Sequence, residues 1–384
     1  MLKNRLLTPG PVAVHEGALT EMSRPLMHHR TPQFSAIFRE CATGLKTVFG
    51  TKQDVLILAG SGSLAMTGAV SNLCSPGDTV ITVNGGKFGE RWTKIAQKYG
   101  LNVLELPVEW GHPVNPAEVK KLLDANPSTR AVYMTASETS TATAHPVKEV
   151  AALTKNLPGT ALVVDGITAV GAIPLPMDEW GVDVLVSGSQ KAFMLPPGLA
   201  FAALSEKAWK LTETAKLPRF YEDFKKERAA LKDDTSAWTP AVSLIVGLRE
   251  VLKSFEAEGM EKRLAATALL AKATRAGCEA MGLPIYSKSP SDSVTAAVLP
   301  DAVPAGKLVK YMRDKLGVAM AAGQDAIKDR VVRISHMGFL DGFDMLTALS
   351  ALETGLTQFG HKVELGKGPA AAQRLLIAGA PAAK

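Results

Sequence analysis

Cysteine is scarce in this sequence. Its 384 residues include only three, Cys41, Cys74 and Cys278, and these lie far apart in the chain. An odd number of cysteines at such spacings provides neither a disulfide framework nor the paired ligands of a structural zinc site. We therefore expect no metal site and a reducing compartment, with the cytoplasm as the default location.

Long apolar runs and long charged runs are also missing. No hydrophobic stretch approaches the length that crosses a bilayer, and the opening segment MLKNRLLTPGPV lacks the apolar centre of a signal peptide. The net charge of +6 is spread along the chain in short clusters rather than gathered into a basic block. These absences argue against a membrane or a nucleic-acid partner, and they favour small anionic substrates.

The chain does contain enough apolar material for a large core, since 46% of its residues are hydrophobic and 21% are charged. From residue 55 onward, short apolar runs alternate with segments of helical periodicity. This alternation predicts an α/β fold with a mostly parallel, seven-stranded sheet that helices cover on both faces. The runs taken as buried parallel strands are 55–59, 80–83, 102–106, 131–134, 161–164, 182–186 and 200–204.

The pattern changes near residue 240, where a long helical stretch begins with a predicted break at Gly259. Strands and helices in mixed order follow, and they predict a smaller α+β C-terminal domain. We expect an N-terminal segment over 1–20 near the active site, a large domain over 21–260 and a small domain over 261–384. The first forty residues are predicted to be irregular because of their prolines, and the tail from His361 to be loosely held.

The turn AGSGSLAM after the first predicted strand suggests a phosphate site. Its small residues Ser61, Gly62 and Ser63 would let backbone N–H groups approach a phosphate at a helix N-terminus. A dinucleotide does not fit, because the next strand ends in Asn84 rather than in the acid that would hold a ribose. The alternative is a tight strand-to-helix turn without a ligand.

Asp165 and Lys191 follow two successive predicted strands. Ligands bind at the carboxyl ends of strands in open α/β sheets, so both side chains are expected over one crevice. Lys191 lies in the apolar stretch VSGSQKAFMLPPG, where either its stem snorkels to water or its amine is kept dry as a nucleophile. Asp165 could instead cap a helix. An acid, an amine and a phosphate cradle at one sheet edge are the groups that pyridoxal phosphate (PLP) needs.

These motifs resemble those of class V aminotransferases, which are fold-type-I PLP enzymes. The resemblance rests on TPGP near the start, on GSG after the first strand, and on GSQK before an apolar PPG segment, and it extends to RISHMG. It is closest to the alanine–glyoxylate and serine–glyoxylate (serine–pyruvate) aminotransferases. It implies that the large domain binds PLP and that the protein is a homodimer with shared active sites.

The resemblance also implies a role for each candidate residue. Lys191 would form the Schiff base with PLP, and Asp165 would pair with the pyridine nitrogen. Arg333 would bind the substrate α-carboxylate, for which a guanidinium offers a planar fork. Thr239 would reach the phosphate of the partner subunit. The other cofactor contacts would be Ser61, Gly62, Ser63 and Gln190 at the phosphate, and Phe88, Thr139 and Ile167 at the ring.

The sequence departs from the family pattern at several positions. Phe88 stands where many relatives have Trp, Ala142 replaces a usual Gly, and Ser236 stands where relatives often have Tyr. The segment His28-His29-Arg30 belongs to a loop that borders the active site in this fold. These three residues either influence substrate choice or form plain surface.

We expect the enzyme to move the amino group of a small amino acid, alanine or serine, to glyoxylate or pyruvate. An aspartate aminotransferase is an alternative, with Arg30 as the residue available for a second carboxylate. A cysteine desulfurase is less favoured, because the only late cysteine, Cys278, falls in a helix-like run and Gln190 replaces the usual His. A PLP-dependent regulator that binds DNA would need an N-terminal helix-turn-helix module, for which the first forty residues leave no room.

Overall fold

A computed structural model describes residues 3–379 of the chain. Seven strands form the central sheet in the order β2-β10-β9-β8-β5-β3-β4, and all of them are parallel except β10. The prediction of a mostly parallel, seven-stranded sheet is confirmed. The strands are β2 (Val55–Gly60), β3 (Thr79–Asn84), β4 (Asn102–Pro107), β5 (Ala131–Thr135), β8 (Ala161–Asp165), β9 (Val184–Gly188) and β10 (Gly198–Leu204).

The direction of β10 differs from the sequence prediction, which treated every apolar run as a parallel strand. Ala200 of β10 lies opposite Gly188 on one side and opposite Leu58 on the other, antiparallel to both neighbours. A parallel neighbour needs a crossover long enough to hold a helix, and the segment 189–197 is too short for one. The chain therefore turns back at the carboxyl end of β9, and this turn carries Lys191.

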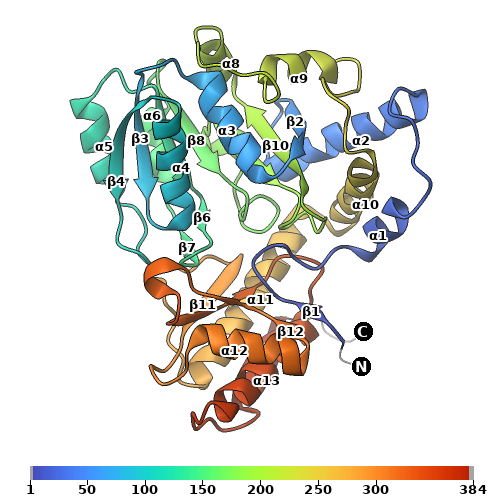
Figure 1. The fold of residues 1–384 in the computed structure, drawn as a ribbon, viewed down its shortest axis with the longest axis vertical. Helices are drawn as coiled ribbons and strands as arrows, with labels where there is room; N and C mark the ends of the chain where they lie inside the picture. The colour runs from blue at the N-terminus through green and yellow to red at the C-terminus, as the bar shows by residue number, and fades with distance from the viewer. Residues whose placement is uncertain (1–2, 380–384) are drawn as a thin grey trace.

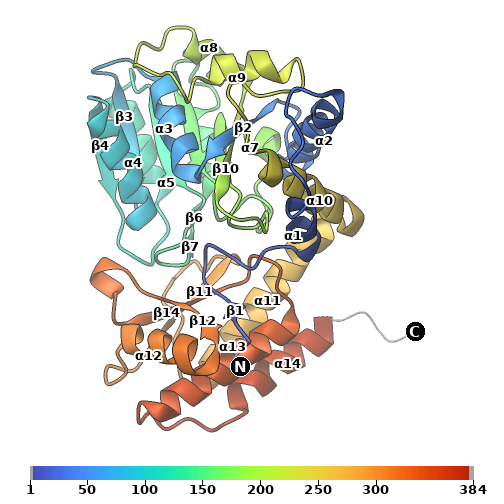
Figure 2. The same ribbon diagram turned by 45° about the vertical axis from the view of Figure 1, so that its right-hand side comes forward.

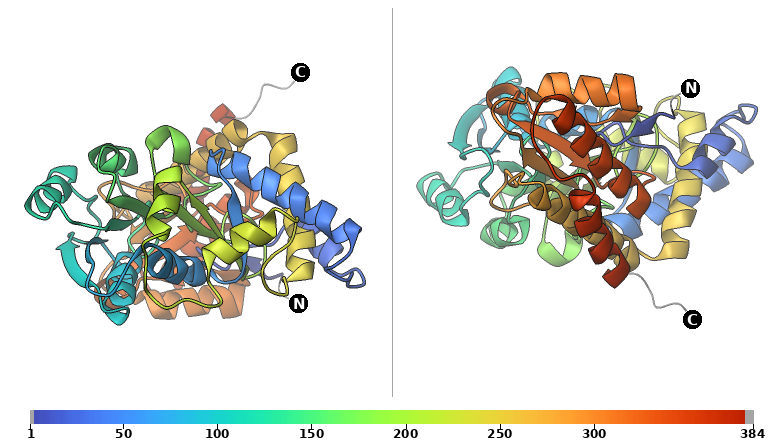
Figure 3. Two further views of the ribbon diagram at one scale, coloured as in Figure 1. Left: turned by 90° about the horizontal axis from the view of Figure 1, so that it is seen from above. Right: turned by 90° about the horizontal axis from the view of Figure 1, so that it is seen from below.

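Helices cover both faces of the sheet because side chains alternate along each strand (Figures 1 and 3). In β2, Ile57 belongs to the apolar core on one face, whereas Leu56 and Leu58 belong to the core on the other. The first face packs against α2 (Pro32–Phe49), α5 (Pro116–Ala125), α6 (Val147–Thr154), α7 (Met177–Trp180) and α10 (Val242–Glu258). The second packs against α3 (Gly62–Leu73), α4 (Lys87–Lys98), α8 (Glu206–Thr212) and α9 (Phe224–Leu231).

A second, smaller sheet lies beyond α11 (Met260–Ala280), below the large sheet in Figure 2. Gly259 separates α10 from α11 with a φ of 83°, a left-handed conformation that favours glycine, and the predicted helix break is confirmed. The smaller sheet is antiparallel, in the order β11-β14-β13, and has its own apolar core. The region around this sheet contains, in chain order, β11 (Val294–Val298), α12 (Ala305–Tyr311), a π-helical turn (Met312–Leu316), β12 (Val318–Ala319), β13 (Ala321–Ala322), a 3₁₀ turn (Asp325–Ile327), β14 (Val331–Ser335) and α13 (Gly342–Gln358). Of its strands, β12 lies in a separate two-stranded sheet.

The N-terminal region contains more regular structure than its prolines suggested. It forms β1 (Arg5–Leu6), which pairs with β12, and α1 (Glu16–Met22), before α2 begins at Pro32. The hydroxyl of Thr31 caps α2 by accepting from the N–H of Phe34 at 3.3 Å. Pro32 is compatible with this helix because the first turn needs no N–H donor. The prediction of irregular structure was wrong for these residues.

Residues 361–379 of the tail are also more ordered than expected, and the rest of the tail, residues 380–384, lies outside the described residues. The described part forms α14 (Lys367–Gly379), which packs against α11 and α13. Gly277 of α11 permits this approach, since a Cβ there would lie 3.0 Å from the carbonyl of Gly368. The buried carboxylate of Glu353 accepts from the N–H of Gly368 at 2.8 Å and so caps the start of α14. Within residues 3–379, no helix is long and apolar enough to cross a membrane.

Candidate active site

The segments that follow five parallel strands meet around a cavity of about 90 Å³ at the carboxyl edge of the large sheet. Most of the candidate residues from the sequence line it, although they are spread over more than 120 positions of the chain. They are Gly62, Ser63, Phe88, Thr139, Asp165, Ile167, Gln190 and Lys191. Ser61 directly precedes this group as the N-cap of α3, and Arg333 and Thr239 lie outside the lining.

Lys191 lies in this cavity with its amine against the N-terminal segment, which passes between the two sheets (Figure 2). Its Nζ donates a hydrogen bond to the carbonyl of Pro9. The contact depends on Gly10, since a Cβ there would lie 2.0 Å from Nζ. Burial lowers the pKa of Lys191 to about 8, while the negative charge of Asp165 raises it. A substantial fraction of the amine is therefore neutral near pH 8, as a nucleophile requires.

Asp165 ends β8 and points its carboxylate into the same cavity. Its Oδ1 accepts from the N–H of Ile167 at 2.8 Å. Burial raises the pKa of the carboxyl to about 6, against the lowering effect of this hydrogen bond. No α-helix begins at Asp165, because the next helix, α7, starts at Met177. The helix-cap alternative is thus not observed, and a buried acid beside a buried amine is a pattern typical of functional sites.

The turn after β2 presents neutral donors to the cavity. Ser61 occupies the N-cap position of α3, yet its side chain makes no capping hydrogen bond. Among residues 3–379, the buried Oε1 of Gln190 has no hydrogen-bond partner. This oxygen can only accept, so the NH2 group of the same amide is the part that could donate to a phosphate. The Gln190 side chain and the start of α3 both lie close to Gly188. A Cβ on Gly188 would lie 3.1 Å from Oε1 of Gln190 and 3.2 Å from the backbone nitrogen of Gly62. This combination fits the phosphate group of a cofactor.

The start of α4 brings Phe88 and Arg91 to the cavity. The fully buried carboxylate of Glu138 accepts from the N–H of Phe88 at 3.0 Å and from that of Gly89 at 2.8 Å, which fixes the first turn of the helix. The guanidinium of Arg91 lies 4.8 Å from the centroid of the Phe88 ring and donates to Oγ of Ser63 at 3.1 Å. Arg91 thus connects α4 with the turn after β2.

Arg333 reaches the edge of the cavity from β14 of the smaller sheet. Its Nη1 donates to the carbonyl of Thr139 at 2.9 Å, and its Nε donates to the carbonyl of Ala322 at 3.0 Å. Burial lowers the pKa of Arg333 to about 10, whereas the charge of Glu138 raises it. Two of the five guanidinium N–H groups are therefore used for orientation, and the others can receive a carboxylate.

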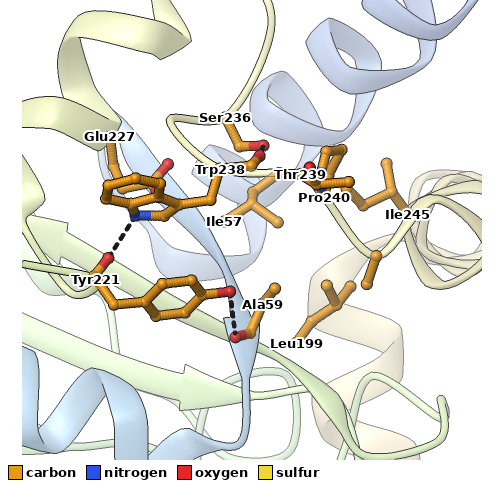
Figure 4. Close-up of a pocket in the computed structure, with 11 residues that line it drawn as sticks. Ile57, Ala59, Leu199, Tyr221, Glu227, Ser236, Trp238, Thr239, Pro240 and Ile245 are labelled. Atoms are coloured by element: carbon orange, nitrogen blue, oxygen red, sulfur yellow. Dashed lines mark hydrogen bonds between the residues drawn. The ribbon is translucent and has the colours of Figure 1, made fainter. Parts of the chain in front are cut away.

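Thr239 does not line the cavity. It is exposed and belongs to a separate pocket, together with Ser236, Trp238 and Tyr221 (Figure 4). The Nε1 of Trp238 donates to the carbonyl of Tyr221 at 2.7 Å, which holds this loop in place. Thr239 also shares a shallow pocket with His28 and His29, and neither of these histidines lines the cavity of Lys191.

Three lining residues were not predicted from the sequence. They are Arg91, Ser137 and Thr168. The hydroxyl of Thr168 bonds that of Thr139 at 2.9 Å and donates to the carbonyl of Ser137 at 2.9 Å. Arg91 could have been found from its position three residues after Phe88, because residues at that spacing share one face of a helix. Ala142, the replacement for a family glycine, has a φ of 58°, a left-handed conformation that is uncommon for residues other than glycine.

Residues 15–340 of this chain match the sequence model of the class V aminotransferase family. Among curated proteins, the chain is 39% identical to the soluble hydrogenase small subunit of Synechococcus sp. (strain PCC 6716), over 97% of this chain and 98% of that one. It is 33% identical to L-aspartate–glyoxylate aminotransferase of Paracoccus denitrificans, over 97% and 96% of the two chains. Identity to serine–glyoxylate aminotransferase of Methylorubrum extorquens is also 33%, with coverage of 97% and 96%.

Solved structures of aminotransferases have the same fold. Pyridoxamine–pyruvate aminotransferase from Mesorhizobium loti has a TM-score of 0.93 and 29% identity, over 99% of this chain and 98% of that one. An aspartate aminotransferase from Thermus thermophilus has 0.86 and 34%, over 93% and 100%. Alanine–glyoxylate aminotransferase from Nostoc sp. has 0.89 and 26%, over 93% and 96%. Family match, relatives and fold agree that this chain belongs to the class V aminotransferases, whose cofactor is PLP.

Proposed function

We propose that this protein is a transaminase that moves the amino group of alanine or serine to glyoxylate or pyruvate. The observation that carries the proposal is the pair of buried groups at one sheet edge. Lys191, with its pKa lowered to about 8, and Asp165, with its pKa raised to about 6, line a single cavity. A nucleophilic amine and an acid at this edge are the two groups that PLP chemistry requires of the protein.

The residues that line the cavity support a PLP site, and we assign them the roles expected from the sequence. Lys191 would hold it covalently, Asp165 would keep its pyridine nitrogen protonated, and Phe88 would stack on the ring. The phosphate would lie at the start of α3, where the NH2 group of the Gln190 amide could donate to it. When bound, PLP supplies an electron sink that stabilises negative charge at the substrate Cα. The remaining phosphate contacts would be Ser61, Gly62 and Ser63, and the remaining ring contacts Thr139 and Ile167.

The protein's own groups would then handle the substrate's carboxylate and proton. Arg333 is oriented by two backbone carbonyls, so its remaining N–H groups can bind an α-carboxylate as a fork. The amine of Lys191 would take the proton from the substrate Cα and return a proton to the cofactor carbon on the other side of the substrate nitrogen, as a general base and acid with a pKa near the working pH. Donor and acceptor would both bind through Arg333, because both are α-carboxylates.

The choice of a small substrate is supported by relatives and by the lining of the cavity. Relatives include enzymes named serine–glyoxylate and alanine–glyoxylate aminotransferase. The side chains of Phe88, Thr139 and Ile167 offer no charge for a distal carboxylate. Aspartate remains the second candidate donor, because two other relatives are named for it and because Arg91 lines the cavity.

We also propose that the active enzyme is a homodimer in which Thr239 serves the neighbouring site. Thr239 is exposed and lines a different pocket from Lys191, which favours a role toward another subunit. Large apolar side chains are exposed beside it, with 68% of Phe220 and 40% of Tyr221 accessible. Exposed apolar surface of this kind is typical of a subunit interface.

The desulfurase alternative is opposed by the environment of the cysteines. Its chemistry needs an accessible thiolate, and burial of Cys278 in α11 raises the pKa of this thiol to about 12. Cys41 and Cys74 are buried as well.

One experiment tests the cofactor site and the substrate together. The purified protein is mixed with single amino acids, and the absorbance of the bound cofactor reports which of them convert it to its amine form. We expect alanine and serine to act faster than aspartate. Borohydride reduction followed by peptide mapping should label Lys191, while a Lys148→Ala variant, which changes an exposed lysine, should be labelled like the wild type. A label on another lysine would contradict the proposal.

A further inference from the structure

The side chains and amides assigned to the cofactor phosphate are all neutral. They are Ser61, Gly62, Ser63, Gln190 and Thr239. The phosphate of PLP carries nearly two negative charges at neutral pH, and a charge taken from water is costly unless it is paired. The start of α3 contributes only about half of a positive charge through its dipole. A cation beside these neutral groups would pair the rest of the phosphate charge, and the sequence motifs do not supply one.

Arg91 is a cation in contact with this group. It extends from α4 into the cavity, and its Nη1 donates to Oγ of Ser63 at 3.1 Å. Two other cations near the cavity, Lys191 and Arg333, have other roles. Lys191 would form the covalent bond to the cofactor, and Arg333 is oriented by the carbonyls of Thr139 and Ala322.

The guanidinium of Arg91 is oriented but has no acidic partner among residues 3–379 of the structure. Its neighbour Glu90 pairs instead with Lys87 at 3.0 Å and with Lys94 at 2.7 Å. The face of the Phe88 ring, 4.8 Å away, holds the guanidinium in place through a cation–π contact. A half-buried guanidinium without a counter-ion is suited to an anion that arrives with a ligand.

We propose that Arg91 binds the phosphate of the cofactor, an inference that rests on the function proposed above and deepens it. Arg91 would act with Ser63 as a charged clamp on one side of the phosphate, and Gln190 and the start of α3 would complete the site. The distal carboxylate of a substrate is also an anion, and a guanidinium could bind it in the same way. We favour the phosphate because Arg91 bonds Ser63, whereas the substrate would be held through Arg333 from the smaller sheet.

The test compares PLP with pyridoxal, which carries the same aldehyde but no phosphate. Full-length protein stripped of its cofactor is titrated with each compound, and absorbance of the adduct on Lys191 gives the two affinities. Arg91→Gln should weaken PLP about 10- to 100-fold, the loss expected for one charge-assisted hydrogen bond. Measured at a pH well above the pKa of Lys191, where the amine is neutral in wild type and variant alike, it should leave the affinity for pyridoxal unchanged. Arg91→Lys, which keeps the charge, should retain most of the affinity for PLP.

Lys94→Gln is the matched control. It removes one positive charge from the same helix, at a largely exposed side chain that pairs with Glu90. Both affinities of this variant should equal those of the wild type.

Three results would overturn the proposal. Equal weakening of PLP and pyridoxal by Arg91→Gln would show that Arg91 only supports the fold of the site. Unchanged PLP affinity with a raised KM for aspartate but not for alanine would assign Arg91 to a substrate carboxylate. Absence of a PLP adduct on Lys191 in the wild type would remove the proposed function itself, and so is distinguishable from the first two results.

Discussion

Replacement of Asp165 by Asn tests how much this buried carboxylate lowers the free energy of unfolding. Burial raises the pKa of this carboxyl from its ordinary value of 3.8 to about 6, so the folded protein binds the proton more tightly than the unfolded chain does. Well below pH 3.8 the group is protonated in both states, and the stability it contributes is fully present. As the pH rises through 6, the folded protein must carry a buried negative charge, and that stability is lost.

The size of the effect follows from the two pKa values. Their difference corresponds to about 3 kcal/mol at pH 7.5. Asn has the same shape without the charge, and its Oδ1 can still accept from the N–H of Ile167, now at 2.8 Å. We therefore expect Asp165→Asn to stabilise the cofactor-free protein by up to about 3 kcal/mol at pH 7.5. For a chain of this length the thermal midpoint should rise by about 4 °C.

The assay is thermal unfolding of the cofactor-free protein, followed by circular dichroism between pH 5 and pH 7.5. The advantage of the variant should shrink as the pH falls toward 4, and its turnover with cofactor should be far below that of the wild type. Asp301→Asn, a change at an exposed aspartate, is the control and should show neither effect. A variant no more stable than the wild type at pH 7.5, or a difference that does not depend on pH, would refute the reasoning.

Three further outcomes are expected. Covalent attachment of PLP to Lys191 should accelerate with pH up to about 8 and then level, because the neutral amine is the nucleophile; a rate that is flat over this range would argue against the lowered pKa. Arg333→Lys keeps the charge but loses the fork, so kcat/KM for alanine and for glyoxylate should both fall about 10- to 100-fold; a loss confined to one of them would disprove a shared carboxylate site. Thr239→Ala should weaken PLP binding, and mixing it with Lys191→Ala should restore activity in mixed dimers; no recovery would exclude shared sites.

The sheet and the central chemistry were predictable from the sequence because they depend on local patterns. A buried parallel strand is an apolar run with a turn at its end, and Asp165 and Lys191 stand directly after two such runs. The direction of β10 was missed because apolar composition carries no information on strand direction. The length of the segment 189–197 would have revealed it, since no crossover helix fits there.

Features that depend on contacts between distant segments could not be predicted in this way. α14 packs because Gly277 and Gly368 let two helices approach, and neither glycine alone predicts that contact. Prolines near the start suggested irregular structure, although Pro32 stands at a helical position that tolerates it. Arg91 carries no motif of its own in the sequence, and its place in the cavity lining and its contact with Ser63 depend on how α4 packs beside the turn after β2.

The cations around Lys191 couple anion binding to the proton affinity of its amine. Burial is the main cause of the lowered pKa of Lys191, and the charges of Arg333 and Arg91 lower it further. An anion seated on either guanidinium would cancel part of that effect and raise the pKa of Lys191. The amine is thus most nucleophilic before the anionic ligands bind, and it becomes a stronger proton acceptor after they bind.

The same coupling predicts the behaviour of Arg91→Gln in the absence of any ligand. Removal of one positive charge should shift the pH profile for attachment of pyridoxal to higher pH, because the pKa of Lys191 rises. Pyridoxal is the suitable probe, since its binding does not involve the phosphate site. Lys94→Gln, with its charge already paired by Glu90 at 2.7 Å, should leave the profile in place. A profile that moves to lower pH in Arg91→Gln would show that burial, rather than charge, dominates the change.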